Sequence, residues 1–260
     1  MNDKLAKILY PTAVLILVMA LWQWGADRSL FPSYILPAPS EVALRTQATF
    51  SVMLDHAAVT TMEIILGFAL ALVLGVLLAW LIAFVRVFEQ AFYPWLVFIQ
   101  VLPKVALGPL LVVWMGVGYL PKILVSFLLG FFPIMIDTLV GLKSVPRDYT
   151  FLLRSMGAGP LKRFWRFQLP YALPHIFASL KVGITLAAVG AIVGEFIGAD
   201  KGLGYVLIVA TGTMDTTLLF VALIWISVLS LLLYAVVGGF ERIFVSWHAV
   251  ARHAEVRDAG

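Results

Sequence analysis

Residues 64–85 read IILGFALALVLGVLLAWLIAFV and contain no Asp, Glu, Lys or Arg. A helix needs about 20 apolar residues to cross the roughly 30 Å hydrocarbon core of a bilayer. Two further stretches, 8–26 and 216–240, are of comparable length and also lack these charged residues. Lipid offers no partner to backbone N–H and C=O groups, so each stretch is predicted to form a transmembrane α-helix.

The composition of the whole chain agrees with this interpretation. Of the 260 residues, 62% are hydrophobic and 12% are charged, whereas a soluble domain carries about 25% charged residues. The chain is therefore predicted to be an integral membrane protein, which excludes a soluble domain or a soluble enzyme. Cysteine is absent, which excludes disulfides and cysteine-based sites. The net charge of +4 comes from basic residues that segregate by loop, which indicates membrane topology and argues against nucleic acid.

Six spans fit the hydropathy pattern, at 8–25, 61–84, 89–117, 121–141, 173–197 and 218–240. We therefore expect an all-α membrane protein that forms one transmembrane domain over residues 1–260. The first span follows Lys4 and Lys7 and could be a signal peptide. It is followed by Trp22 and Trp24, which suit a membrane interface, and no small-residue cleavage site precedes polar sequence. A retained anchor is the favoured interpretation.

The basic residues predict the orientation. With the N-terminus inside, twelve Lys and Arg lie on the inner side and four on the outer side. The inner set is Lys4, Lys7, Arg86, Lys143, Arg147, Arg154, Lys162, Arg163, Arg166, Arg242, Arg252 and Arg257, and the outer set is Arg28, Arg45, Lys122 and Lys201. Cytoplasmic loops carry the excess of positive charge, so both termini are predicted to face the cytoplasm.

The third span contains Pro94, Pro103 and Pro109, with Gly108 beside the last. Proline removes a backbone donor and clashes with the preceding turn, so this span should be kinked or broken near its middle. A break inside a membrane is tolerated where protein or a water-filled cavity satisfies the freed polar groups. The break either improves helix packing or lines a transport pathway.

The longest inner loop, about 143–172, predicts two short helices. The first covers 147–156, a break follows at 157–159, a second helix starts at Pro160, and Leu169–Pro170 should stop it. Residues 160–168 are amphipathic and basic, with Phe164, Trp165 and Phe167 among basic side chains. Such a helix could lie on anionic lipid headgroups.

The order of Gly157, a nine-residue gap, Phe167, one residue and Leu169-Pro170 resembles the EAA loop of ABC importer permeases. Four further stretches resemble the branch of that family that imports nitrate, sulfonates, taurine and pyrimidine or flavin precursors. They are YILPAPSEV at 34–42, PKVALGPL at 103–110, WMGVG at 114–118 and GLGY at 202–205. The resemblance covers nearly the whole chain. One departure is Phe151-Leu152-Leu153, which stands where the family has Glu-Ala-Ala.

The resemblance implies the fold and function of a type I ABC importer permease in the bacterial inner membrane. It implies a pathway for a small solute, either an organic or inorganic anion or an aromatic vitamin precursor. The implied partners are two cytoplasmic ATPases, a periplasmic or lipid-anchored binding protein that meets the outer loops around 27–58 and 198–217, and a second permease copy. The implied coupling residues are Phe151, Leu152, Leu153, Gly157, Phe164, Phe167, Leu169 and Pro170.

A phosphate-binding loop is absent, so ATP should not bind this chain. No catalytic residue, metal site or cofactor is expected here, and ATP and Mg²⁺ are expected in the partner ATPase. The scattered histidines, including His56, lack metal-ligand spacing.

Side chains within the spans supply the candidate pathway residues, because a charge there is costly. They are Gln100, Pro103, Lys104, Trp114 and Glu195. Lys104 could attract an anionic solute, snorkel or pair with an acid. Asp137 is expected to pair with a base such as Lys143, and Glu63 is expected near a helix N-terminus.

Gly67, Ala71 and Gly75 repeat at four-residue spacing, which predicts close helix packing. An ion-gradient-driven secondary transporter is the alternative function. It predicts paired broken helices in two related halves, and only one broken span is found. An intramembrane enzyme would need convergent catalytic side chains, which are not found.

Overall fold

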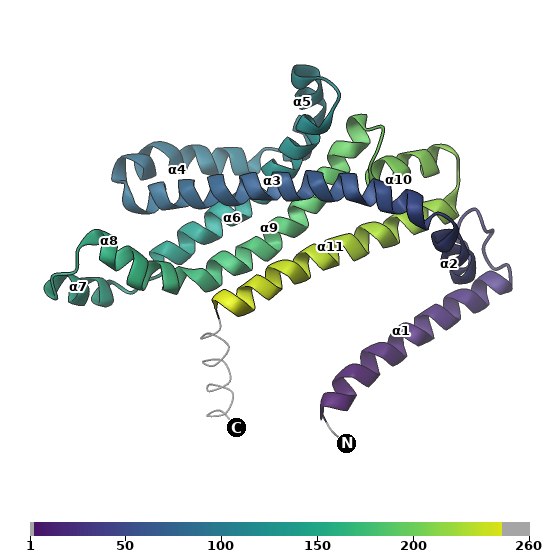
Figure 1. The fold of residues 1–260 in the computed structure, drawn as a ribbon, viewed down its shortest axis with the longest axis horizontal. Coiled ribbons are helices and arrows are strands. Elements are labelled where there is room, and N and C mark those ends of the chain that lie inside the picture. Colours follow the sequence, from purple (N-terminus) through teal and green to yellow (C-terminus); the bar gives the residue numbers. More distant parts are fainter. Residues whose placement is uncertain (1–2, 246–260) are drawn as a thin grey trace. The chain divides into compact units, whose positions relative to one another are not determined.

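The computed structural model describes residues 3–245, and all regular secondary structure in that range is helical (Figure 1). The elements are α1 (Asp3–Asp27), α2 (Pro39–Ala48), α3 (Phe50–Phe84), α4 (Arg86–Val101), η1 (Lys104–Leu107), α5 (Gly108–Met115), α6 (Tyr119–Lys143), α7 (Arg147–Ser155), α8 (Pro160–Arg163), η2 (Phe164–Gln168), α9 (Leu169–Gly198), α10 (Leu203–Gly212) and α11 (Thr216–Phe244).

Within the described residues, five helical stretches are long and apolar enough to cross a membrane: Leu9–Asp27, Phe50–Phe84, Tyr119–Lys143, Phe164–Gly198 and Thr216–Phe244. The sixth candidate span is the pair Arg86–Val101 and Lys104–Met115, which is bent by 88°. Five of the six spans predicted from hydropathy are thus found, the bent pair corresponds to the predicted third span, and its predicted break lies at Leu102–Pro103. The helix α3 begins eleven residues earlier than expected.

The described residues divide into two compact units, one made of 3–59 with 200–227 and the other of 60–199 with 228–245. A single permease domain over residues 1–260 stays a prediction.

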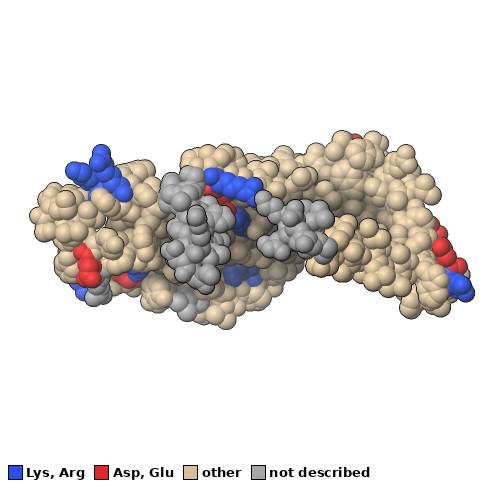
Figure 2. All heavy atoms as spheres, turned by 90° about the horizontal axis from the view of Figure 1, so that it is seen from below, with Lys and Arg blue, Asp and Glu red and all other residues tan. Residues whose placement is uncertain are grey.

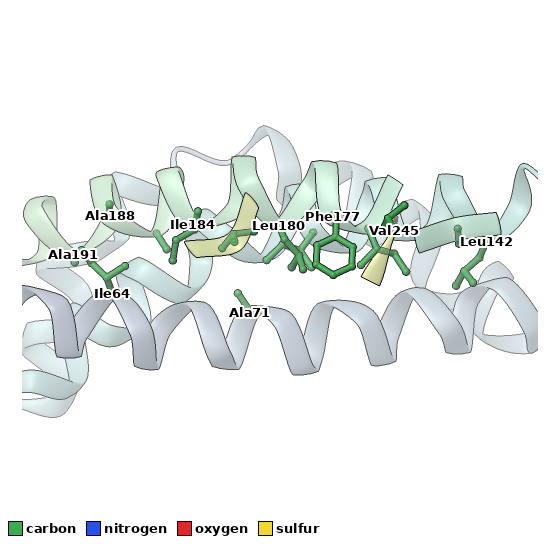
Figure 3. Close-up of a cluster of buried hydrophobic side chains, with 14 residues drawn as sticks. Ile64, Ala71, Leu142, Phe177, Leu180, Ile184, Ala188, Ala191 and Val245 are labelled. Atoms are coloured by element: carbon green, nitrogen blue, oxygen red, sulfur yellow. The ribbon is translucent and has the colours of Figure 1, made fainter. Parts of the chain in front are cut away.

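The second unit is built on α6, which packs against α9 and also receives α3. Its apolar core includes Ile64 and Ala71 of α3, which point toward side chains of α9 (Figure 3). The α9 side chains of this core include Phe177, Leu180 and Ile184, all less than 9% exposed.

Small residues bring these three helices close together. A Cβ at Gly75 of α3 would lie 3.2 Å from Ile134 Cγ2 of α6, and one at Gly190 of α9 would lie 2.6 Å from the Cα of Ser126. The Ser126 hydroxyl donates to the Ala187 carbonyl at 2.9 Å across the same contact. The close packing predicted from the Gly67, Ala71 and Gly75 repeat is confirmed, because lipid-embedded helices associate through such small-residue contacts.

The first unit contains α1, the first part of α11 and the two segments, around 27–58 and 198–217, that the sequence predicts to lie outside the membrane. Trp22 donates to the Pro37 carbonyl at 3.0 Å, and Arg45 pairs with Asp215 at 3.0 Å. Thr216 donates to the Tyr34 carbonyl at 2.5 Å. Two outer segments that are far apart in sequence therefore meet within this unit.

The surface of the described residues is predominantly apolar. Few charged side chains appear on the face in Figure 2, and Leu15, Ile16 and Leu17 of α1 are about 60% exposed. Large exposed apolar surface of this kind suits contact with lipid or with other membrane helices.

The structure corrects two predictions about local geometry. Leu169–Pro170 does not stop the second loop helix, since η2 is a π-helix that leads directly into α9. The Leu169 N–H donates to the Phe164 carbonyl, one residue further back than in an α-helix, and such a wide turn accommodates the ring and missing donor of Pro170. Glu63 lies more than three turns inside α3 and not at its start.

Candidate functional site

The break in the third span places Lys104 over a carbonyl that the helix leaves free. The helix α4 ends at Val101, and Leu102 and Pro103 leave the helical conformation with ψ of 138° and 87°. The Lys104 ammonium donates to the Gln100 carbonyl at 2.9 Å. The last carbonyls of a helix have no partner within it, so the lysine side chain replaces the backbone bond lost at the break.

Lys104 also lies over the Phe132 ring, 4.6 Å from its centroid. A cation over an aromatic face is attracted by the ring quadrupole. Both residues line a pocket of about 440 Å³ with Gln100, Asp137 and other residues of α6 and α9. Its full lining is Gln100, Lys104, Leu129, Phe132, Pro133, Ile136, Asp137 and Leu186.

A second pocket of about 700 Å³ continues along α4 and α6 and shares Gln100 and Ile136 with the first. It extends to Glu89 and Lys143. We call these two pockets together the α4–α6 groove. The groove follows α6 from its middle to Lys143, which is its predicted cytoplasmic end.

An ion pair lies at that end of the groove. The Lys143 ammonium is 2.5 Å from Glu89 Oε1, and the two side chains are 40% and 46% exposed. The prediction that Asp137 pairs with Lys143 is therefore wrong. Lys143 ends α6 and reaches the acid of α4, which leaves Asp137 on the lining of the pocket that holds Lys104.

The structure brings together only some of the predicted pathway residues. Gln100 and Lys104 share one pocket, with Pro103 at the bend between them and α5. Trp114 lies on α5 with 69% of its surface exposed. Glu195 is 1% exposed and accepts a hydrogen bond from Thr60, so it lies inside the helix bundle and does not line either pocket of the groove. The role of each in transport stays a prediction.

The predicted coupling segment, 147–170, has the helix–break–helix form that its sequence indicates. The helix α7 ends at Ser155, and Gly157 has a φ of +73°, a conformation that glycine adopts without steric cost. Two of its apolar side chains, Phe151 and Leu152, are 63% and 56% exposed. They offer a surface that a partner protein could cover.

The second half of the coupling segment is attached to the bundle by aromatic packing. Phe164 lies edge-on to Trp80 and to Phe84 of α3, with ring centroids 6.3 and 5.5 Å apart. Leu169 packs against the apolar core, whereas Phe167 is 42% exposed. Of the other predicted coupling residues, Leu153 and Pro170 are partly buried. A displacement of this segment must therefore move against α3 and α9.

One residue that the sequence analysis set aside has a defined partner. The backbone N–H of Gly202 donates to His56 Nδ1 at 3.0 Å, and Gly202 has a φ of +118°. His56 thus fixes the turn that begins the GLGY stretch. Scattered histidines give no periodic or spacing signal, so sequence alone could not have paired it with a residue 146 positions away.

A bundle of apolar helices long enough to cross a membrane, with one sharply bent pair beside a groove, is typical of a membrane transport protein. Residues 71–246 match the family described as binding-protein-dependent transport system inner membrane component, and the chain belongs to this family. It is therefore a multi-pass inner-membrane permease of an ABC importer. Its fold is of type I, and its partners are an ATPase and a substrate-binding protein.

Related proteins of known designation agree with this assignment. The chain is 39% identical over 237 residues to a riboflavin transport system permease protein of Chloroflexus aurantiacus, covering 90% of this chain and 88% of that one. It is 36% identical to a formylaminopyrimidine transport permease protein of Halalkalibacterium halodurans, covering 93% and 96%. It is 27% identical to the taurine transport system permease protein of Escherichia coli, covering 93% and 90%.

Among solved structures, a chain of the MetNI methionine ABC transporter in inward-facing conformations has the same fold. The TM-score is 0.64 at 17% sequence identity, covering 76% of this chain and 98% of that chain. Family membership also decides between the functional classes considered from sequence, because permease subunits of ABC importers are neither secondary transporters nor themselves catalytic.

Proposed function

We propose that two copies of this chain form the translocation pathway of the importer and that the α4–α6 groove of each copy lines it. The observation that carries this proposal is the pocket at the broken span, where Lys104, Phe132 and Asp137 converge. Polar groups that converge on a mostly apolar concavity are the usual composition of a small-molecule site.

The charges of this pocket bear on the class of solute. Lys104 supplies one positive group and Asp137 one negative group to the same lining, while Phe132 supplies an aromatic face. A pathway for an inorganic anion would be expected to carry positive charge without a facing acid, because the acid opposes anion entry. We therefore propose a neutral or dipolar heteroaromatic solute in preference to a simple anion.

The names of two relatives support the same class. Relatives that share 39% and 36% of their residues with this chain are named for the transport of riboflavin and formylaminopyrimidine. Both solutes are ring systems with hydrogen-bond donors and acceptors, which suit a lining of Lys, Asp and Gln side chains.

Energy for transport is proposed to come from two cytoplasmic ATPases that bind ATP and Mg²⁺ and dock on residues 147–170. The exposed Phe151 and Leu152 supply apolar contact surface at the positions where the family has Glu-Ala-Ala. No cofactor is proposed for this chain. Binding of ATP by the ATPases would favour one of two permease conformations. The equilibrium between the two conformations can shift by no more than the difference in the free energy with which the ATP-bound ATPases bind each of them.

The Glu89–Lys143 pair is proposed to act as a gate at the cytoplasmic end of the groove. Exposed ion pairs contribute little to stability because water and salt screen them, so the conformational change can separate these side chains at little cost. The pair can then reform when the pathway closes.

The test is ATP-dependent uptake by proteoliposomes that contain the permease, its ATPase and its binding protein. A radiolabelled pyrimidine or flavin should accumulate with the intact chain, and Lys104→Met and Asp137→Asn should each reduce uptake. Val113→Ala is a matched control, because Val113 is 79% exposed on α5 and lies outside the groove. Uptake of sulfonate with no uptake of any heteroaromatic solute would contradict the proposed solute class.

A further inference from the structure

A pocket of about 520 Å³ lies within the second unit, toward the predicted cytoplasmic end of its helices. It shares no lining residue with the α4–α6 groove. Val73, Leu77 and Trp165 are each at least half exposed, so the pocket opens on the surface of the described chain. Its lining is apolar except for one threonine and consists of Leu72, Val73, Val76, Leu77, Trp80, Thr138, Leu142, Phe164, Trp165, Leu169 and Ile176.

The pocket follows α3 for about the depth of one membrane leaflet. Leu72 lies twelve residues before Phe84, the last residue of α3, which is about 18 Å along the helix axis. The hydrocarbon core of a bilayer is roughly 30 Å thick, and each leaflet supplies half of it. Leu72, Val73 and Val76 therefore form an aliphatic surface at the depth of the acyl chains of the cytoplasmic leaflet.

The one polar side chain of the lining lies closer to the cytoplasmic end. Thr138 is five residues from Lys143, the last residue of α6. It is fully buried, and its hydroxyl oxygen has no hydrogen-bond partner among the described residues. A buried hydroxyl without a partner is costly, so Thr138 favours an occupant that carries an oxygen acceptor at this depth.

The coupling segment supplies positive charge next to the pocket. Lys162, Arg163 and Arg166 flank the lining residues Phe164 and Trp165 in the sequence. Lys162 and Arg166 are exposed, whereas Arg163 Nε is buried and has no hydrogen-bond partner within the part of the chain that the structure describes. Guanidinium groups bind phosphate oxygens through charge-assisted hydrogen bonds. Basic clusters at the cytoplasmic side of membrane helices attract anionic lipid headgroups.

We propose that this pocket binds one anionic phospholipid of the cytoplasmic leaflet. An acyl chain lies along the aliphatic surface of α3, a glycerol-ester oxygen accepts a hydrogen bond from Thr138, and the phosphate binds Arg163 and the basic side chains beside it. The order of aliphatic, hydroxyl and basic groups matches the order of acyl chain, ester and phosphate in such a lipid. The bound lipid joins α3, α6 and α9 to the second half of the coupling segment.

The test is photolabelling of the full-length chain in phosphatidylcholine nanodiscs that contain a trace of phosphatidylglycerol with a diazirine near the end of one acyl chain. The label should attach within residues 72–77, and unlabelled phosphatidylglycerol should compete with it. A phosphatidylcholine probe with the same diazirine should label this segment much more weakly. Val73→Trp should fill the pocket and abolish the labelling. Val182→Trp is the matched control, because Val182 is an exposed valine of α9 outside the lining.

Arg163→Gln tests the contact with the phosphate. Loss of a hydrogen bond to a charged group changes an equilibrium constant by about tenfold or more, so roughly ten times more phosphatidylglycerol should be needed for half-maximal labelling. Arg86→Gln is the control, because Arg86 is also exposed and predicted to be cytoplasmic but begins α4. An unchanged half-maximal concentration in Arg163→Gln would contradict the phosphate contact.

Three further results would overturn the proposal. The first is the absence of label from residues 72–77 of the wild-type chain, which would mean that the pocket is empty or covered by a second copy, and which can be read even if the variants do not fold. The second is equal labelling by the phosphatidylcholine probe, since the headgroup would then not be recognised. The third is undiminished labelling of a Val73→Trp variant that keeps the wild-type Tm.

Discussion

Lys104 and Asp137 give the broken span its chemical character at the scale of single residues. Lys104 satisfies the Gln100 carbonyl and lies over Phe132, so its ammonium group is held on the lining of the pocket. Asp137 lies on the same lining and has no part in the ion pair that sequence reasoning assigned to it. In the proposed pathway, the Lys104 ammonium faces the negative end of a dipolar solute and the Asp137 carboxyl group faces its positive end.

We predict that Lys104→Met lowers uptake by reducing solute affinity within the pathway. A hydrogen bond to a charged group contributes about 1.5–3 kcal/mol, which corresponds to roughly a 10- to 150-fold change in an equilibrium constant. The measurement is the solute concentration dependence of ATP-driven uptake. Retention of wild-type uptake by Lys104→Met together with Asp137→Asn would exclude this pocket from the pathway.

We predict that the Glu89–Lys143 pair can be reversed without loss of function. Glu89→Lys should place two positive charges at the end of the groove and raise solute leakage in the absence of ATP. The double variant Glu89→Lys with Lys143→Glu should restore the attraction and reduce the leak again. A double-mutant cycle on leak rates isolates the coupling between the two residues, and a coupling free energy of zero would contradict the gate.

Sequence reasoning identified part of this site and missed the rest for a physical reason. Lys104 and Gln100 were found because they flank prolines in an apolar span, which is a local signal. The partners of Lys143 and His56 lie 54 and 146 residues away. Single-sequence patterns carry no information about such contacts, so Asp137 was assigned the nearest base along the chain.

At the scale of elements, glycines set how closely α3, α6 and α9 approach one another. Gly190 contacts the backbone of α6, where an added Cβ would lie 2.6 Å from the Cα of Ser126. Gly239 of α11 has no atom within 4 Å of a built Cβ. The two positions are both helical glycines, and they differ in the space around them.

We predict that Gly190→Ala destabilises the bundle and that Gly239→Ala does not. Inserting a methyl group into a closely packed contact typically costs about 1–3 kcal/mol, and the backbone of Ser126 cannot rotate away. The Tm of each variant in detergent or nanodiscs is the measurement. An unchanged Tm for Gly190→Ala would show that α6 and α9 separate more easily than their packing indicates.

The helices were largely predictable, because charge-free runs favour membrane helices and prolines favour breaks in them, and both signals lie in residues that are close together in the sequence. The break in the third span and the Gly157 turn were both anticipated. The π-helical turn at Phe164–Gln168 was not, since the Leu-Pro pair predicts a helix end by local rules. Aromatic packing of Phe164 on Trp80 and Phe84 favours continuation of the helix, and that packing depends on a distant part of the chain.

At the scale of the whole molecule, we propose that the predicted coupling segment connects this chain to its energy source. Phe151 and Leu152 are exposed on α7, at the positions where the family carries Glu-Ala-Ala. The family could be assigned from sequence, whereas the proposed class of solute depends on a small number of side chains that line the pocket.

We predict that Phe151→Ser with Leu152→Ser uncouples ATP hydrolysis from transport. We expect Phe151 and Leu152 to be hot-spot residues of this interface, for which truncation costs about 2 kcal/mol or more, so the assembled complex should lose most of its binding-protein-stimulated ATPase activity. Val182→Ser is the control, because Val182 is 49% exposed on α9 and lies outside the coupling segment. Full stimulation by the binding protein in the double variant would place the docking surface elsewhere.

The unbroken helical path from Phe164 to Gly198 has a mechanical consequence. Its 35 residues make a rod about 50 Å long. Near Gly194 and Glu195 the rod is fastened to its neighbours by close backbone contact and buried polar side chains. We propose that this fastening is the pivot when the ATPases push on the Phe164 end, which is about 45 Å away along the helix, so a tilt of about ten degrees moves that end through roughly 8 Å.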